Sequence, residues 1–415
     1  GALRQRGHEV LVLANEEFQP AIHAAGLEGV ALGTSAHYSE VINRPELWSA
    51  YRGFEVLANN IMLYHMRDMF EGVRTRVIPG ETVVAAPMIA LGARVARDAL
   101  RVPLVSVAIQ PAILRSLIAP PRIKWLPVRK GRPVWWNRFW FQYVDLVYVD
   151  RILRRRLNQF RKTLGLDRVE HVADWWGSPD GILGLFPEWY ATPAPDWPPR
   201  TRLTDFPRFD RESQDSLELA PEIDQFFPPR TTDGRVADNA PVLLTVGSAM
   251  RQGNTFFEVA LSAVARLGRT AALLTKYPEQ LPSPLPSFAR HFRYIPFSAI
   301  FPRSAAVVHH GGIGTVAQAL AAGTPQVIMP MSHDQFDNAD RVRSLGVGVR
   351  LEPRRFTPDR VFHALNGLTR NPQVQAACRL QAARFDQPPR FDEACQFLEH
   401  ARFETGPTIT AHAWL

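Results

Sequence analysis

Short apolar runs alternate with helical patterns in two stretches of the chain, residues 1–190 and 241–385. Runs of this length, rich in Val and Leu, are typical of buried parallel strands. The alternation predicts the α/β class, with a Rossmann-like parallel sheet in each stretch. The predicted strands are Glu9–Ala14, Thr82–Ala86, Pro103–Ala108, Pro241–Val246, Thr270–Thr275, Ala305–His309 and Pro325–Met329. The predicted helices between them include Ala90–Leu100, Phe256–Leu267 and Thr315–Ala322.

Prolines are concentrated between the two stretches, where they oppose helix interiors and central strands. They are Pro193, Pro195, Pro198, Pro199, Pro207, Pro221, Pro228 and Pro229. We therefore predict a first domain over 1–190, a linker over 191–240, a second domain over 241–385 and a C-terminal helix with a tail over 386–415. The C-terminal helix is expected to pack on the first domain.

The chain opens with residues 2–6, which have the pattern of a helix end, followed by Gly7. Glycine is common just after a helix end. A helix that precedes a parallel strand normally follows an earlier strand of the same sheet. We expect that the first strand and its loop are missing from this sequence. A natural start with a short N-terminal helix is the alternative.

Composition limits the class of protein. The 415 residues are 46% hydrophobic and 21% charged, which is ordinary for a globular protein and excludes a wholly disordered chain. No apolar run approaches the ~20 residues of a membrane-spanning helix. The two cysteines, Cys378 and Cys395, form neither a disulfide framework nor a metal-type cluster, so we expect a cytoplasmic protein. A net charge of +8 does not by itself indicate nucleic-acid binding.

The residues with the clearest chemistry follow the predicted strand that ends at His309. A glycine-rich turn with Gly311, Gly312 and Gly314 leads into a helix near Thr315. Backbone N–H groups in such a turn, together with the helix dipole, suit a pyrophosphate. His310 can donate a hydrogen bond to phosphate, and Thr315 offers a hydroxyl. On the glycines alone, a tight turn without a ligand is an equally good interpretation.

The longer segment resembles the donor-sugar motif of the GT-B glycosyltransferases, the UDP-glycosyltransferase superfamily (families 1 and 28). The matching residues are Tyr294-Ile295-Pro296-Phe297, His310-Gly311-Gly312, Gly323-Thr324-Pro325, Asp334-Gln335 and Asn338-Ala339. The resemblance implies two Rossmann-like domains that face each other across a cleft. It also implies that the donor binds the second domain and the acceptor binds the first.

By this resemblance each part of the donor has its own residues. The diphosphate would contact His310, Gly311, Gly312, Gly314 and Thr315, with Gly247 and Ser248 of a second loop beside them. The sugar would contact Asp334 and Gln335, and the nucleoside Tyr294, Phe297 and Gln318. Many relatives have Glu where this chain has Gln318. His309 is at least as well explained as a strand-end side chain as by a ligand-binding role.

Further segments are similar to the bacterial rhamnosyltransferases that make rhamnolipids. They are Asn43–Trp48, Ala90–Arg94, Ala119–Pro121, Leu185–Trp189 and Asp196–Pro198. The resemblance implies transfer of a hexose, with L-rhamnose as a candidate, from a dTDP- or UDP-sugar to a hydroxyl of an apolar, lipid acceptor. It also implies inversion, no metal and no cofactor. A sugar-nucleotide epimerase and an inactive sugar-nucleotide-binding partner are the alternatives.

No catalytic residue is assigned from the sequence. Family members usually have the catalytic base, a His or an Asp, in the loop after the first strand, and that loop would precede Gly1. His37 and His65 are the obvious substitutes to consider. Each is better explained as a surface or cleft histidine.

Basic residues are concentrated between 127 and 162, interleaved with aromatic residues. The basic residues are Arg129, Lys130, Arg132, Arg138, Arg151, Arg154, Arg155, Arg156, Arg161 and Lys162, and the aromatic ones are Trp135, Trp136, Phe139, Trp140, Phe141 and Tyr143. One interpretation is a helical hairpin with its aromatics in the core and its arginines in solvent. The other is a peripheral contact with an anionic membrane or an anionic lipid acceptor. No nucleic-acid motif accompanies these residues.

Overall fold

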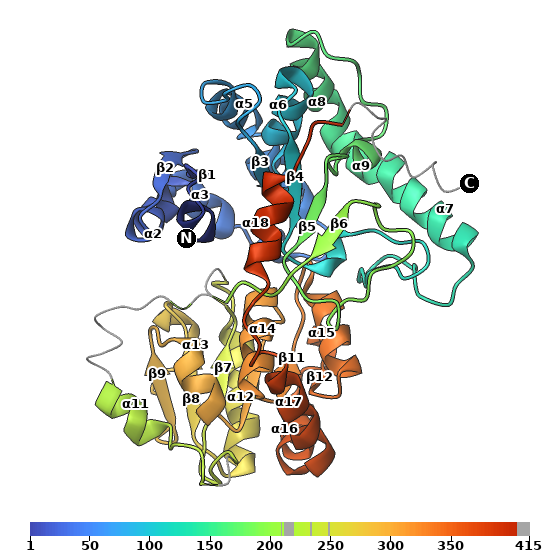
Figure 1. The fold of residues 1–415 in the computed structure, drawn as a ribbon. Coiled ribbons are helices and arrows are strands. Elements are labelled where there is room, and N and C mark those ends of the chain that lie inside the picture. The colour runs from blue at the N-terminus through green and yellow to red at the C-terminus, as the bar shows by residue number, and fades with distance from the viewer. Residues whose placement is uncertain (209, 211–219, 233–234, 248–249, 405–415) are drawn as a thin grey trace. The chain divides into compact units, whose positions relative to one another are not determined.

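The computed structural model describes residues 1–208, 210, 220–232, 235–247 and 250–404. The chain forms two compact units (Figure 1). Unit 1 contains Gly1–Asp205 and the chain from Pro389 onward, and unit 2 is Phe206–Pro388. The division therefore falls inside the proline-rich stretch 191–240, and both flanks of that stretch belong to folded units.

Unit 1 contains two parallel sheets. Strands β1 (Leu11–Ala14) and β2 (Glu28–Ala31) form a pair. A second sheet has the order β3 (Val84–Pro87), β4 (Leu104–Ala108), β5 (Ile182–Gly184) and β6 (Thr201–Leu203). The helices are α1 (Ala2–Gln5), α2 (Gln19–Ala24), α3 (Ser35–Ile42), α4 (Gly53–Leu57), α5 (Met66–Arg74), α6 (Leu91–Leu100), α7 (Val134–Val144), α8 (Asp150–Thr163), α9 (Val172–Trp175) and α18 (Phe391–Glu399).

The main core of unit 1 lies between α5, α6 and α8, where Phe70, Leu91, Leu153 and Leu157 are buried together. The predicted helix end before Gly7 is α1, and Gly7 has a φ of 89°. Helix α18 packs on this unit, with Ala394 in one cluster with Val105 and Leu183 (Figure 1).

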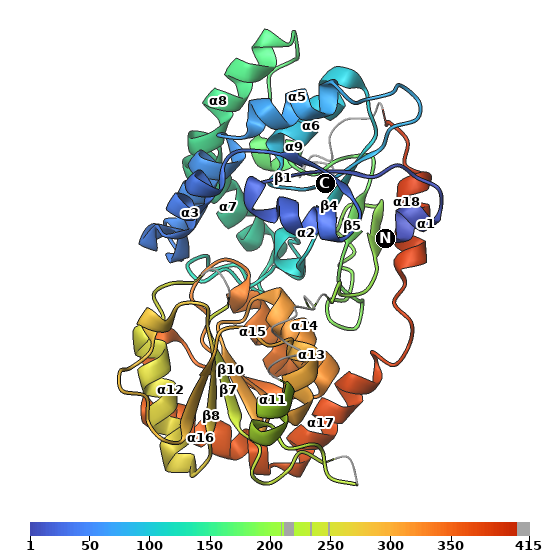
Figure 2. The same ribbon diagram turned by 90° about the vertical axis from the view of Figure 1, so that its left-hand side faces the viewer.

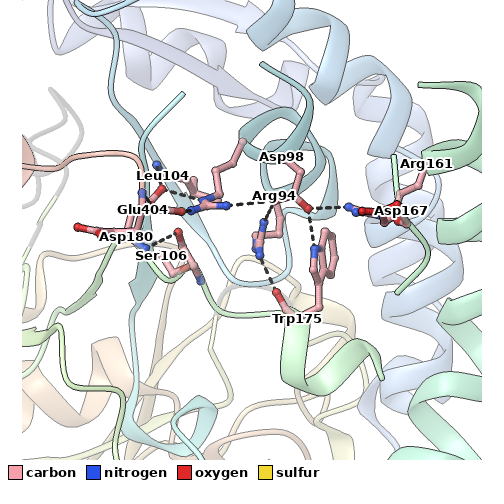
Figure 3. Close-up of polar contacts among 11 residues, drawn as sticks. Arg94, Asp98, Leu104, Ser106, Arg161, Asp167, Trp175, Asp180 and Glu404 are labelled. Atoms are coloured by element: carbon pink, nitrogen blue, oxygen red, sulfur yellow. Dashed lines mark hydrogen bonds and ion pairs between the residues drawn. The ribbon is translucent and has the colours of Figure 1, made fainter. Parts of the chain in front are cut away.

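Buried charges connect the C-terminal segment to α6 and β4 (Figure 3). Asp180 accepts hydrogen bonds from Arg97 at 2.6 and 2.8 Å and from the backbone N–H groups of Leu104 and Glu404 at 2.9 and 2.8 Å. Asp98 accepts from Arg161 Nη1 at 2.6 Å, from Trp175 Nε1 at 2.8 Å, and from Arg94. Arg161 is 6% exposed, so its placement in a surface cluster of basic residues was wrong. The carboxylate of Asp98 compensates the burial of its charge.

Unit 2 has one parallel six-stranded sheet with the order β12 (Gly348–Arg350), β11 (Gln326–Ile328), β10 (Ala306–His309), β7 (Val242–Thr245), β8 (Ala271–Leu274) and β9 (Ala289–Phe292). Helices cover both faces, with α12 (Asn254–Leu267) and α16 (Pro358–Arg370) on one side and α13 (Phe297–Ile300) and α14 (Ile313–Ala322) on the other (Figure 2). The other helices in the described part of this unit are α11 (Ala220–Phe226), α15 (Gln335–Ser344) and α17 (Pro372–Ala383). The predicted α/β class, with parallel sheets in two units, is confirmed.

The proline-rich stretch contains regular structure. Among the described strands, β6 pairs with β5 alone, so it is an edge strand of the sheet. Helix α11 has Pro221 at its second residue, a position whose N–H makes no intrahelical bond in any case. Ile223 and Phe227 are buried in the core of unit 2 with Leu243 and Phe301. Prolines therefore mark the ends of short elements here, and do not exclude them.

Candidate functional site

The candidate site lies at the carboxyl ends of the central strands of unit 2. In chain order the strands lie 3-2-1-4-5-6 across the sheet, so the order reverses between β7 and β10. Ligands of open α/β sheets bind at the carboxyl ends beside such a switch point. Register places Thr245, His309 and Ile328 at the ends of adjacent strands. The loops after these strands carry the predicted diphosphate and sugar residues.

His309 holds the start of the glycine turn. Its ring is fully buried, Nδ1 accepts a hydrogen bond from the Gly311 N–H at 3.1 Å, and Nε2 lies 3.0 Å from Gln326 Oε1. With Nδ1 accepting, the ring proton is on Nε2 and is donated to Gln326. Burial lowers the pKa of His309 to about 3, so the ring is neutral at physiological pH. These contacts give His309 a structural role in the turn.

His310, which is predicted to contact the diphosphate, follows His309 in the same turn. Its ring lies against Gly247 and Gly312, where an added Cβ would be 2.6 Å from Cε1 and 2.5 Å from Nε2, respectively. Larger residues at either position would displace the ring. Burial lowers its pKa to about 4. Among the described residues, Nδ1 has no hydrogen-bond partner. A buried polar atom without a partner has a desolvation cost that a ligand could relieve.

Helix α14 begins directly after this turn, with Gly312 at its N-cap. Its first backbone N–H groups have no partner within the helix and suit an anion. Gly314 is exposed, and a Cβ there would meet nothing within 4 Å, so the space above it is open. Thr315 is 7% exposed. Ser248 lies outside the described residues.

Asp334 and Gln335 are connected to the same turn through Asn338. The Asn338 amide nitrogen donates to Asp334 Oδ2 at 2.6 Å and to the Gly311 carbonyl at 3.0 Å. Gln335 Oε1 accepts from the N–H groups of Met331 and Ser332 at 2.8 and 3.1 Å, so its amide nitrogen is the part left for a ligand. Burial raises the pKa of Asp334 to about 6. Asn338 had been given no role from the sequence.

The nucleoside candidates lie on α13 and α14 and on the segment before them. Tyr294 is 39% exposed, and the partly exposed Phe297 ring stacks on Phe301 with centroids 4.4 Å apart. Gln318 is 8% exposed and donates a hydrogen bond to Asp210 at 3.3 Å. The structure thus brings Phe297 and Gln318 to the carboxylate of Asp210, a residue to which the sequence assigned no role.

The two histidines considered as substitutes for a base lie close together in unit 1. His37 stacks on Tyr64 with centroids 4.1 Å apart, and its Nε2 is 3.0 Å from the Asn60 carbonyl. His65 is 7% exposed, and its ring centroid is 5.8 Å from that of His37. Burial lowers the pKa of His65. The contacts of His37 and His65 do not identify either as the catalytic base, and we assign no residue to that role.

The aromatic and basic segment forms α7, a π-helical turn over Asp145–Val149, and α8. Residues at four-residue spacing are exposed along all three elements. Trp135, Phe139, Tyr143 and Val147 are 67%, 53%, 50% and 41% exposed, and Arg151, Arg155 and Gln159 continue the series as exposed residues. We call these seven residues the α7–α8 row. Phe141 is buried, so the aromatics divide between core and surface.

A cavity of about 550 Å³ lies beside the basic end of this row. Its cationic lining residues are Arg151, Arg154, Arg155, Lys162 and Arg168. No helix in the described ranges is long and apolar enough to cross a membrane. The same ranges contain no group of three or more His, Cys, Asp or Glu side chains that could hold a metal ion.

Comparison with known proteins identifies the class. Residues 264–399 match the family described as erythromycin biosynthesis protein CIII-like, C-terminal domain. The chain is 28% identical to O-mycaminosyltylonolide 6-deoxyallosyltransferase of Streptomyces fradiae, covering 85% of this chain and 80% of that protein. It is similar in fold to the kitacinnamycin glycotransferase, with a TM-score of 0.69 and 19% identity over 97% of this chain and 93% of the other. The spinosyn rhamnosyltransferase SpnG matches with a TM-score of 0.62 and 20% identity, over 96% and 94% of the chains.

The chain is a nucleotide-sugar-dependent glycosyltransferase with the GT-B fold. Within that class it is similar to the glycosyltransferases of antibiotic biosynthesis. A particular closeness to the rhamnolipid enzymes is not shown by these relatives, although a rhamnosyltransferase is among the structural neighbours.

Proposed function

We propose that this protein transfers a hexose from a dTDP- or UDP-sugar to a hydroxyl of an apolar acceptor, with inversion at the anomeric carbon. One observation carries the proposal. The His310 ring, the glycine turn before α14, and the Asp334–Asn338 pair are joined by direct contacts at the carboxyl ends of β10 and β11. In the proposed site they would supply hydrogen-bond donors to the phosphates, beside hydrogen-bond acceptors for the sugar hydroxyls.

In this reaction the acceptor oxygen forms a bond to the anomeric carbon while the bond from that carbon to the diphosphate oxygen breaks. The acceptor proton passes to a base that we do not assign. Negative charge develops on the leaving diphosphate. The His310 N–H and the N–H groups at the start of α14 would stabilise that charge, and donors held in place before reaction do so efficiently.

The sugar would be held by Asp334 and by the amide nitrogen of Gln335. An ionised carboxylate accepts hydrogen bonds, and an amide nitrogen donates them, so the pair can bind adjacent hydroxyls. L-rhamnose is the first sugar to test, because of the similarity to rhamnosyltransferases in the sequence. We further propose that the reaction needs neither a metal ion nor a cofactor, so activity should survive chelation by EDTA.

We propose a lipid hydroxyl as the acceptor, with peripheral contact at an anionic membrane. The α7–α8 row supports this, because its first four residues are apolar and exposed while Arg151 and Arg155 follow at the same spacing. Apolar side chains at an interface enter the acyl boundary, and arginines meet anionic headgroups. The competing acceptor class is an antibiotic-type aglycone, the kind that the names of the relatives indicate for those proteins.

The function is tested by incubating the full chain with a panel of dTDP- and UDP-sugars and two acceptor classes, hydroxy-fatty acids and macrolide aglycones. Formation of a glycoside, detected by mass, supports the transferase reaction. Isomerised or free sugar without a glycoside would favour the epimerase alternative. Product with the aglycone alone would overturn the lipid acceptor and leave the donor assignment in place.

A further inference from the structure

A carboxylate from the chain between β6 and α11 reaches the nucleoside candidates of unit 2. Asp210 Oδ1 accepts hydrogen bonds from the Phe297 N–H at 3.2 Å and from Gln318 Nε2 at 3.3 Å. Its Oδ2 accepts from the Ser298 N–H at 2.9 Å. Phe297 and Gln318 lie on two separate helices, and Asp210 is the group that joins them.

All three donors to Asp210 are neutral. No ion pair involving Asp210 occurs among the residues described by the structure, and its side chain is partly exposed. An ionised carboxylate offers about four acceptor positions. Described residues occupy three, so within this part of the chain one acceptor position is left for a donor from solvent or from a ligand.

The position of Asp210 limits which part of a donor sugar can lie beside it. Gln318 follows Thr315 by three residues, slightly less than one turn of α14, and the start of α14 is the proposed diphosphate site. A second anion beside a carboxylate is repelled. The neighbouring ligand group must therefore be neutral and must donate a hydrogen bond. In a nucleoside diphosphate the pentose adjoins the diphosphate and carries such hydroxyls.

We propose that Asp210 is a nucleoside-binding residue that accepts a hydrogen bond from a pentose hydroxyl of the donor. This inference rests on the proposed function, because it takes unit 2 to be the donor site. Gln318 and the two backbone N–H groups hold the carboxylate, and the pentose hydroxyl takes its remaining acceptor position. Since dTDP has no 2′-hydroxyl, the 3′-hydroxyl is the group common to both candidate nucleotides.

The test compares two nucleotides on the full chain by calorimetry. The tighter binder of dTDP and UDP is measured beside its 2′,3′-dideoxy form, with wild type, Asp210→Asn and Asp210→Ala. Wild type should lose about tenfold or more in affinity with the dideoxy form, as expected for a hydrogen bond to a charged group. The variants should bind the parent nucleotide more weakly and lose less than twofold with the dideoxy form. Asp224→Asn is the matched control, because Asp224 pairs with Arg303 on the surface of the same unit.

Three results would overturn the inference. If the variants weaken both nucleotides by one common factor, Asp210 only caps α13 and contacts no hydroxyl. If wild type binds both nucleotides equally, the pentose hydroxyls meet no acceptor, while the donor site itself stands. If wild type binds neither nucleotide, the proposed function fails, and this inference fails with it.

Discussion

Replacement of His310 by Ala should weaken binding of the free nucleoside diphosphate. The ring is neutral, because burial lowers its pKa to about 4, and in the proposed site it would donate one N–H to an anionic phosphate oxygen. A hydrogen bond to a charged group contributes about 1.5–3 kcal/mol, or roughly 10- to 150-fold in the dissociation constant. We expect the same loss or more in kcat/KM, because the leaving diphosphate gains charge in the transition state.

The structure provides two controls for this measurement. Removing the ring also removes its packing against Gly247 and Gly312, so His310→Gln, which keeps volume and a donor, should recover part of the affinity. His363→Ala removes an exposed histidine of α16 in the same unit and should change nothing. Affinity is measured by calorimetry with dTDP and UDP, and folding by circular dichroism. A folded His310→Ala protein that binds within twofold of wild type would refute the phosphate role.

Three further predictions concern pH, stability and membranes. Burial raises the pKa of Asp334 to about 6, so kcat/KM should fall below that pH as the carboxylate is protonated. Asp334→Asn should lack this acid limb of the pH profile, and an unchanged profile in the variant would exclude Asp334 as the group that titrates. Asp180→Ala leaves the buried Arg97 without its main partner, so it should lower the free energy of unfolding, measured by urea denaturation, by about 3–5 kcal/mol. The control Asp359→Ala removes an exposed carboxylate and should lower it by less than about 1 kcal/mol. Equal effects of the two variants would show that the buried ion pair contributes no more to stability than the exposed one. Binding to anionic vesicles should exceed binding to neutral ones and should decrease as salt is added. The double variant Arg151→Gln/Arg155→Gln should bind anionic vesicles more weakly than the surface control Arg354→Gln/Arg355→Gln. No preference for anionic vesicles would exclude the membrane contact.

Local sequence was sufficient for the central strands of unit 2. The predicted strands Pro241–Val246, Thr270–Thr275, Ala305–His309 and Pro325–Met329 contain the observed strands β7, β8, β10 and β11, respectively. Strands buried on both faces are continuous apolar runs and are easily recognised. The edge strands β9 and β12 were not predicted, because β9 reads Ala-Arg-His-Phe and β12 has three residues. Edge strands meet solvent and can carry polar residues, so no apolar run marks them.

The chemistry at the glycine turn was also present in the sequence. A turn of this kind is formed by adjacent residues, so His310, Gly312 and the start of α14 are brought together by local chain geometry alone. Asp334 and Gln335 were named from their resemblance to a family. Their connection to the turn depends on the Asn338 bond to the Gly311 carbonyl, which joins positions 27 residues apart.

Only the tertiary structure decided which polar side chains are buried and which surfaces are free. Arg155 and Arg161 belong to the same basic segment of the sequence, yet Arg161 pairs with Asp98 of α6 while Arg155 is exposed. His309 and His310 are neighbours, but His309 is the last residue of β10 and bonds Gln326, while His310 lies in the turn after the strand, with its ring against Gly247. Asp210 reaches Gln318 across 108 residues. Contacts over such distances depend on the packing of whole elements, which a local pattern of residues does not encode.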